Sequence, residues 1–226
     1  KPMLQDFWRE GLFDEMDKRY FRLINRATSL QDMVDWELLG DYSPYETFKT
    51  IFDGNNVRKA SYFDLMTHFD FKTLLPALLQ VEDRVSMAHG LESRVPFLDH
   101  PLIEMAATMP ADIKFAGGQG KRILKEAMGP VLPPAIVKRE DKMGFPVPFT
   151  EWIRAEARDF VHDTLSSAAA TNRDLVDNTK VLEKLESEPK FGRTVWGFLS
   201  LELWQQEFHD KADEYKKLMR GAGNLT

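Results

Sequence analysis

The spacing of apolar residues predicts α-helix along nearly the whole chain. In residues 3–27 large apolar side chains recur at intervals of three and four positions, with charged residues between them, which is typical of an amphipathic helix. No segment alternates apolar and polar residues as a half-buried strand does, and there is no internal repeat. The fold is therefore predicted to be mostly α-helical. The same helical spacing recurs in residues 61–69, 74–90, 151–165, 175–188 and 192–219.

Residues suited to capping mark several helix ends. Ser43, Pro44 and Glu46 form a capping box with proline at the first helical position, so a helix is expected to begin there. Gly90 is placed to end one helix and Asp99 to cap the next. Residues 166–174, which are small and polar, are expected to form a mobile loop.

Composition narrows the class of protein. The chain has 226 residues, is 43% hydrophobic and contains 16 Phe and 5 Trp, which is ample for a packed core in one large domain or two small ones. A net charge of −6 without a basic block argues against nucleic acid and anionic membranes as main partners. The absence of cysteine excludes disulfides and thiol nucleophiles and fits a cytoplasmic location. Because amphipathic helix begins almost at Lys1, we expect the chain to be a piece of a larger protein.

Common binding motifs are absent. The five histidines are scattered without paired ligand spacing, so no metal site is expected. Residues 115–122 are superficially similar to a phosphate-binding loop, but Phe115 stands where that loop needs glycine, and Arg122 replaces its Ser or Thr. A flexible turn entering a helix is the better interpretation. Lys121 and Arg122 at that helix start could still attract an anion.

Two stretches carry charge in unusual settings. In residues 82–100 a helix with Asp83 and Arg84 leads into an extended piece where Glu92 and Arg94 share a face. Such charges must pair if they are buried. Glu92 and Arg94 could clamp neighbouring elements by pairing with Arg84 and Asp83. Alternatively, they could belong to a functional site.

The second stretch is basic and stiffened by proline. Lys138, Arg139 and Lys142 precede Gly144 in residues 137–152, with prolines at 146 and 148. A lysine on such a loop can be presented to a phosphate as a point charge. The alternative is a solvated basic loop.

Residues 79–154 closely resemble the synthetase domain of glutamine-dependent asparagine synthetases. The resemblance rests on E-x-R-V-P-F-L-D at 92–99, G-K-x-x-L-K-E-A at 120–127 and K-M-G-F-P-x-P at 142–148, in this order and spacing. It implies that aspartate and ATP give β-aspartyl-AMP, which ammonia from an N-terminal glutaminase domain converts to asparagine. It also implies that residues 1–226 form the helical C-terminal part of an α/β ATP-pyrophosphatase-type domain whose parallel sheet lies upstream.

The resemblance assigns roles to residues of this sequence. Lys142 matches the catalytic lysine, whose ammonium would stabilise the charge that grows on departing pyrophosphate. Glu92 and Arg94 are expected to form a buried bracket in the active site, supported by Asp83, Arg84 and Asp99. The stretch that matches the wall of the ammonia tunnel contains Met87, Ser93 and Val95.

The chain also departs from the family pattern. The Ser-Gly-Gly-x-Asp-Ser loop, the Gly-Asp-Gly-x-Asp-Glu stretch and the nucleophilic cysteine are all absent. We therefore expect ATP and Mg²⁺ to be bound mainly by upstream residues, and the isolated chain to be inactive. The loop has one more residue between Arg139 and Lys142 than many relatives have. Lys138 and Asp141 therefore remain candidates for roles next to that of Lys142. The upstream part and glutaminase domain are the expected partners, and a homodimer is possible. Two alternatives to an asparagine synthetase remain. One is a related ligase that forms β-lactams or modifies peptides, and the other is a non-enzymatic helical interaction module.

Overall fold

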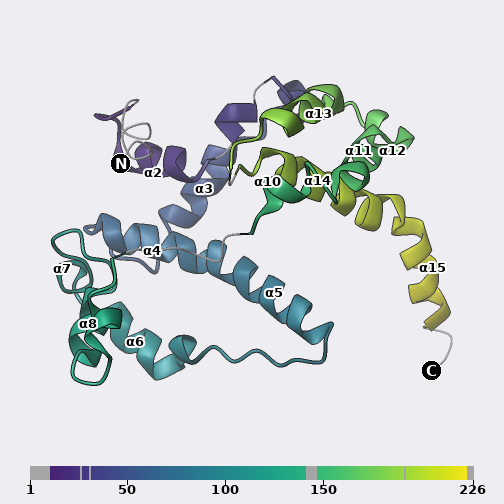
Figure 1. Ribbon diagram of the computed structural model, residues 1–226. Coiled ribbons are helices and arrows are strands. Elements are labelled where there is room, and N and C mark those ends of the chain that lie inside the picture. The colour runs from purple at the N-terminus through teal and green to yellow at the C-terminus, as the bar shows by residue number, and fades with distance from the viewer. Residues whose placement is uncertain (1–10, 26, 31, 141–146, 191, 223–226) are drawn as a thin grey trace. The chain divides into compact units, whose positions relative to one another are not determined.

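Helix dominates the computed structural model of the chain (Figure 1). In the ranges described there is no strand, and the backbone makes only two isolated β-bridges, Val34 with Val176 and Ala116 with Gln119. The prediction of a mostly α-helical structure is confirmed. The structure describes residues 11–25, 27–30, 32–140, 147–190 and 192–222.

The chain divides into two compact units, the first formed by residues 1–25 and 43–142 and the second by residues 26–42 and 143–226. The first contains α2 (Met16–Ile24), α3 (Pro44–Phe52), α4 (Tyr62–Lys72), α5 (Leu74–Met87), η3 (Pro96–Leu98), α6 (His100–Thr108), α7 (Ala111–Lys114), α8 (Arg122–Met128) and α9 (Pro134–Val137). The second contains η1 (Ala27–Leu30), η2 (Trp36–Leu39), α10 (Phe149–Trp152), α11 (Arg158–Ser166), α12 (Ala168–Thr171), α13 (Asn178–Ser187), α14 (Thr194–Trp204), η4 (Gln205–Asp210) and α15 (Ala212–Ala222).

Serine caps begin two helices of the first unit. The hydroxyl of Ser43 accepts a hydrogen bond from the backbone N–H of Glu46 at 3.3 Å, which confirms the predicted start of α3. Ser61 does the same for Asp64 at the start of α4, also at 3.3 Å. Each bond satisfies a backbone donor that has no partner within the helix.

Aromatic side chains form the core of the first unit. Tyr20, Phe48, Phe52 and Leu65 are buried together where α2, α3 and α4 meet. The rings of Phe48 and Phe52 stack with centroids 4.9 Å apart. The Tyr20 hydroxyl reaches Asp70 on α4 with a 2.9 Å hydrogen bond, so its polar end is satisfied inside the apolar cluster.

After α5 the chain turns and returns through an extended segment to α6 (Figure 1). Gly90 has a φ of +69°, a conformation that suits glycine, and helix α5 ends just before it, as predicted. Asp99 is the N-cap residue of α6, but its side chain makes no capping hydrogen bond. The predicted position of the cap is therefore confirmed, whereas the capping hydrogen bond expected of the Asp99 side chain is not formed.

Three helices build the core of the second unit. Val161 and Leu165 of α11, Val181 of α13 and Val195 of α14 are almost completely buried in one cluster, together with Ile153. These residues lie on the apolar faces that the sequence spacing predicts. The second unit thus has a compact apolar centre of its own.

Residues 166–174 contain a short helix where a loop is predicted, and their mobility stays a prediction. They include α12, whose Ala170 is buried, and the hydroxyl of Ser167 caps it by accepting a hydrogen bond from the Ala170 N–H at 3.2 Å. Arg173 then bonds to two carboxylates, Glu202 on α14 and Asp210 in η4. Packing and ion pairing therefore connect a segment whose composition is typical of mobile loops to α14 and η4.

The helix predicted over residues 151–165 is divided into α10 and α11 by turns. Between them, Arg154 donates hydrogen bonds to the backbone oxygens of Glu186 and Glu188, both at 2.7 Å. The guanidinium thus joins this turn to the end of α13, a contact between residues more than 30 positions apart that no local pattern predicts.

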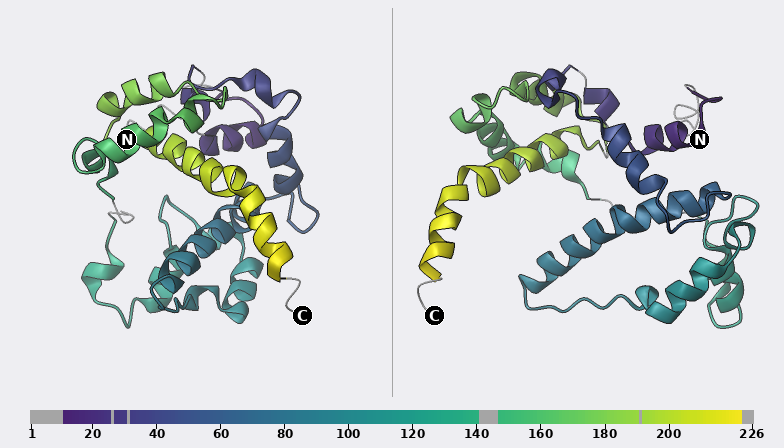
Figure 2. Two further views of the ribbon diagram at one scale, coloured as in Figure 1. Left: turned by 90° about the vertical axis from the view of Figure 1, so that its right-hand side faces the viewer. Right: turned by 180° about the vertical axis from the view of Figure 1, so that it is seen from behind.

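The helix predicted over residues 192–219 is interrupted by the π-helical segment η4, and Figure 2 shows α15 continuing beyond it after a bend. Glu207 in η4 accepts hydrogen bonds from the Lys211 ammonium and the Tyr215 hydroxyl of the following turns. These bonds, that from Lys211 first, hold the pKa of Glu207 below its usual value of 4.5. Wide π-turns are uncommon within helices, and side-chain bonds support this one.

Candidate functional site

The extended segment after α5 is fastened to that helix by two hydrogen bonds. The backbone N–H of Leu91 donates to the carbonyl of Ser86 at 3.0 Å. The hydroxyl of Ser93 donates to the Glu82 carboxylate, also at 3.0 Å. Ser93 is one of the residues predicted to line a tunnel, whereas no sequence pattern singles out Glu82 or Ser86. These two fix the start of the segment that bears the E-x-R motif.

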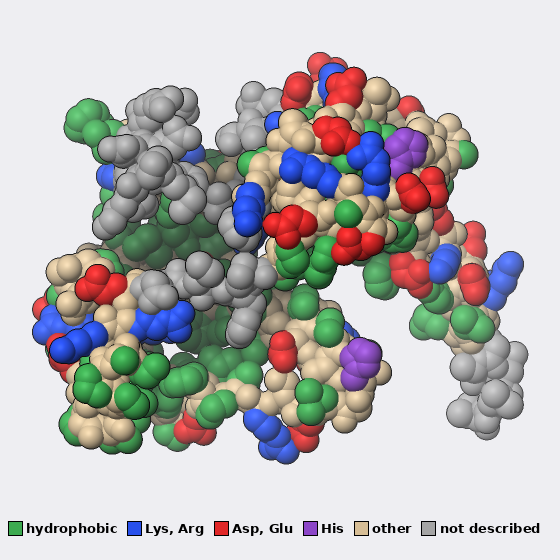
Figure 3. Space-filling model, viewed as in Figure 1, with side chains coloured by type: hydrophobic (Ala, Val, Ile, Leu, Met, Phe, Trp, Pro, Cys, Tyr) green, Lys and Arg blue, Asp and Glu red, His purple; other side chains and the backbone are tan. Residues whose placement is uncertain are grey.

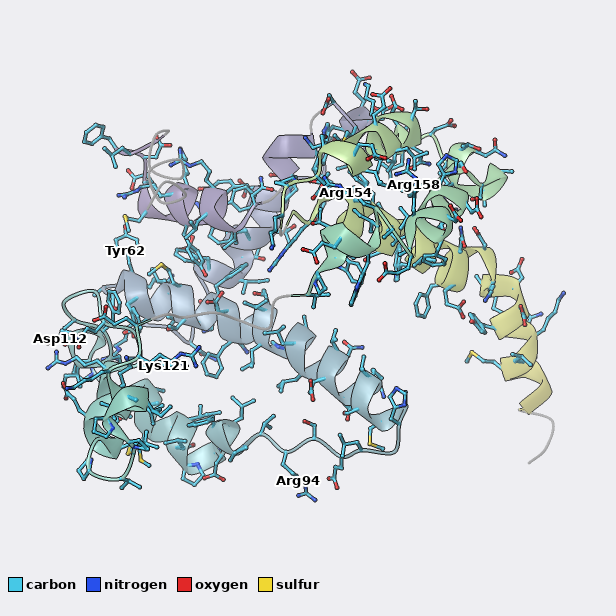
Figure 4. All side chains as sticks on the ribbon, viewed as in Figure 1. Tyr62, Arg94, Asp112, Lys121, Arg154 and Arg158 are labelled. Carbon is cyan, nitrogen blue, oxygen red and sulfur yellow. The ribbon has the colours of Figure 1, made fainter. Side chains whose placement is uncertain are left out.

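Glu92 and Arg94 pair with each other but are not buried. The guanidinium and carboxylate are 3.0 Å apart, and the side chains are 69% and 80% exposed for Glu92 and Arg94 respectively. Figure 4 shows Arg94 pointing away from the neighbouring ribbon. The buried bracket is therefore not formed among the described residues of this chain, and the supporting role of the pair in an active site stays a prediction. An ion pair this exposed stabilises a fold by about 0–1 kcal/mol.

The predicted clamp through α5 does not form either. Asp83 and Arg84 are also exposed, and their charged groups pair with each other at 3.6 Å instead of reaching Glu92 or Arg94. Adjacent residues on a helix point in different directions, so this pair holds no second element in place. The remaining residues predicted for the tunnel, Met87 and Val95, expose 52% and 46% of their surface.

Helix α8 carries the residues of the G-K-x-x-L-K-E-A motif. Arg122 bonds through Nε to the Glu126 carboxylate one turn later, at 2.7 Å. Lys121 precedes the helix in the left-handed conformation with φ +58°, and its position is labelled in Figure 4. Lys121 and Arg122, which are expected to attract an anion, are thus not equivalent, because the charge of Arg122 is already paired with Glu126. With only seven residues, α8 adds little dipole attraction.

The basic stretch after α9 begins with a fixed backbone. The N–H of Lys138 donates to Pro134 O at 2.9 Å and that of Arg139 to Ile136 O at 3.3 Å. From α8, the Lys125 ammonium donates to the carbonyl of Arg139 at 2.7 Å. Lys125 belongs to the quoted motif but was not predicted as a site residue. Lys142 and Asp141 lie outside the described residues.

A hollow in the second unit contains none of the predicted site residues. It has a volume of about 460 Å³ and lies between residues 32–35 and 171–180, with Asp32, Asp35, Asp174 and Asp177 in its lining. Every described residue predicted for the site belongs instead to the first unit. Within the described residues, no group of three or more His, Asp or Glu side chains could hold a metal ion.

The surface has a mixed character. On the face in Figure 3, basic and acidic side chains are interspersed, with apolar side chains exposed between them. None of the helices described is both long and apolar enough to cross a bilayer.

Comparison with known proteins gives one family. The sequence model of the asparagine synthase family matches residues 2–206. The chain is 27% identical over 190 residues to "Asparagine synthetase [glutamine-hydrolyzing] 1" of Bacillus subtilis, covering 81% of this chain and 30% of that protein. It is 34% identical over 149 residues to the "Putative asparagine synthetase [glutamine-hydrolyzing]" of Mycobacterium bovis. This match covers 63% of this chain and 22% of that protein. The chain spans less than a third of the length of these relatives. No solved structure matches the chain significantly.

Proposed function

Since the family match extends over residues 2–206, the chain belongs to the asparagine synthase family, and we propose that it forms the helical C-terminal part of an ATP-dependent amide-forming ligase. In this reaction the aspartate carboxylate attacks the α-phosphorus of ATP, which gives β-aspartyl-AMP and releases pyrophosphate. Ammonia derived from glutamine then displaces AMP and gives asparagine. The observation that carries the proposal is the order of the three motifs, which follow one another as in the family from residue 92 to residue 148.

In this proposal two lysines act on the phosphates. Lys142 stabilises the negative charge that develops on pyrophosphate as it leaves, which a fixed ammonium does best where water is excluded. Lys121 has no hydrogen bond or ion pair to its side chain in the described part of the chain, so its charge is available for a phosphate oxygen. Met87, Ser93 and Val95 line the path of ammonia, and the exposed Glu92–Arg94 pair contacts the substrates or another part of the enzyme.

The residues present suit phosphate oxygens better than magnesium. The chain offers lysines for the anion, but its described residues contain no cluster of acidic ligands, and the sequence has no Ser-Gly-Gly-x-Asp-Ser loop. The proposal therefore assigns most of the binding of ATP and Mg²⁺, the parallel sheet of the α/β domain and the glutaminase step to sequence outside these 226 residues. When bound, Mg²⁺ would neutralise charge on the phosphates.

Aspartate-dependent exchange between ATP and pyrophosphate tests the function in the complete enzyme. Lys142→Ala should slow exchange by about 10²–10³ and leave glutamine hydrolysis intact, because a single preorganised charge is removed. Lys72→Met is the matched control, since Lys72 is exposed at the end of α4. Near-normal exchange by Lys142→Ala would refute the role of this lysine. Exchange with another carboxylate, but not with aspartate, would indicate a related ligase, and no exchange with any carboxylate would indicate a non-enzymatic module.

A further inference from the structure

Helix α14 is apolar around its whole circumference. Of its 11 residues, TVWGFLSLELW, Glu202 alone is charged, and its buried carboxylate pairs with Arg173. A helix that is hydrophobic all round is typical of the interior of a larger protein. In the described part of the chain one side of α14 is covered: Val195, Phe198 and Leu199 are buried where α11 and α13 pack against the helix (Figure 1).

The opposite side of α14 is aromatic and exposed. Trp196, Leu203 and Trp204 expose 54%, 37% and 47% of their surface, and Phe208 in η4 exposes 60%. Residues 196, 200, 203 and 204 share one side of the helix, because positions three, four and seven apart lie above one another. The Phe208 ring extends this side, since its centroid lies 6.4 Å from that of Trp204. Together Trp196, Ser200, Leu203, Trp204 and Phe208 form what we call the bare face.

The bare face has the size and composition of a protein-binding surface. Because a fully covered aromatic side chain buries about 150–250 Å², its half-exposed rings leave roughly 300–400 Å² of apolar surface open, a patch size that is often functional. Tryptophan is enriched where protein interfaces gain most of their binding energy. None of the five residues is ionisable, so the surface that covers them must also be free of unpaired charge. Beside them, a Cβ added at Gly197 would meet nothing within 4 Å, which leaves room for a side chain of the partner.

We propose that the upstream nucleotide-binding part of the same protein covers the bare face, an inference that rests on the proposed function. The family match extends to residue 206, so α14 belongs to the region shared with the family. Since the chain covers 30% and 22% of the two relatives, most of their length lies outside it and can supply an apolar surface. An anionic membrane suits the face less, because the chain has a net charge of −6 and no basic block. Helix α14 is then a wall with the core of the second unit on one side and the upstream part on the other.

Hydroxyl-radical footprinting, quantified for each residue by mass spectrometry, tests the proposal on the 226-residue chain and on the complete protein. Oxidation of Trp196 and Trp204 should be about tenfold or more slower in the complete protein, because a well-packed interface core excludes water. Ser200→Arg places a charge in the centre of the bare face and should restore oxidation of both tryptophans in the complete protein. Lys216→Glu, a charge change at an exposed position of α15, is the control and should leave the protection intact. If Ser200→Arg lowers the urea midpoint of the 226-residue chain, Leu203→Lys replaces it.

Equal oxidation of the two tryptophans in the chain and in the complete protein would overturn the proposal. Protection already present in the 226-residue chain would overturn it too, since no upstream sequence is then needed; protection that rises with the concentration of this chain would identify a second copy as the occupant, and protection only on addition of phospholipid vesicles would identify a membrane. Aspartate-dependent ATP–pyrophosphate exchange is measured separately on the same complete protein. Exchange without protection refutes the docking alone, whereas protection without exchange for any carboxylate refutes the proposed function and leaves the docking on upstream sequence in place.

Discussion

The ion cluster around Arg173 offers the most direct test of how the second unit is held together. Its guanidinium donates to Glu202 through Nε at 2.8 Å and Nη2 at 3.1 Å, and to Asp210 through Nη1 at 3.1 Å and Nη2 at 2.6 Å. Glu202 is only 6% exposed and also accepts a hydrogen bond from Gln206 at 2.9 Å. Arg173→Met removes the cation and leaves this buried carboxylate without a counter-charge.

The size of the effect follows from the burial of Glu202. Removing one partner of a buried ion pair costs about 3–5 kcal/mol, mainly because the other charge remains in a poorly solvated place. Gln206 still donates to Glu202 in the variant, so we expect the lower end, about 3 kcal/mol. Asp210 is far more exposed and returns to water on losing Arg173, so Asp210→Asn should destabilise much less.

Urea unfolding followed by tryptophan fluorescence measures this loss. The second unit holds four of the five tryptophans: Trp36, Trp152, Trp196 and Trp204. The fluorescence change therefore reports mainly on the unit that contains Arg173.

A double variant provides the control. Arg173→Met combined with Glu202→Met removes both charges and should recover much of the lost stability, because no buried charge is left unpaired. A loss below about 1 kcal/mol for Arg173→Met, or a double variant no more stable than the single one, would refute the reasoning.

Three further changes test other contacts. Tyr45 donates a hydrogen bond to Asp17 that raises the pKa of the phenol from 10.0 to about 12. The contribution of this hydrogen bond to stability should be complete below pH 10 and lost as the pH approaches 12. Tyr45→Phe should therefore reduce the decline of stability at alkaline pH, as measured by urea unfolding. In Gly192→Ala the new Cβ would clash with the carboxylate of buried Glu188, so a melting curve should show a loss of about 1–3 kcal/mol. Glu92→Ala should cost at most about 1 kcal/mol, because its ion pair is exposed; a loss of several kcal/mol would mean that the pair is buried after all.

The sequence by itself determined the helical class and most helix positions. Apolar residues three and four positions apart can form one face only on a helix, so the buried faces of α11, α13 and α14 could be predicted before any contact was known. The start at Ser43 was readable because a capping hydrogen bond joins residues three positions apart. The family was readable for a similar reason, since each of its motifs is a continuous run of residues.

Only the tertiary structure decided which charges are buried and where the long helices divide. Glu92 and Arg94 looked built for burial, yet burial needs a second surface, and within the described residues none covers them. Residues 166–174 looked mobile, yet Arg173 is held by carboxylates 29 and 37 positions away. The same holds for Lys125, whose partner lies 14 positions on, beyond the motif that contains it. Local patterns record what a residue can do, whereas burial and ion pairing depend on residues that the fold brings together from distant parts of the chain.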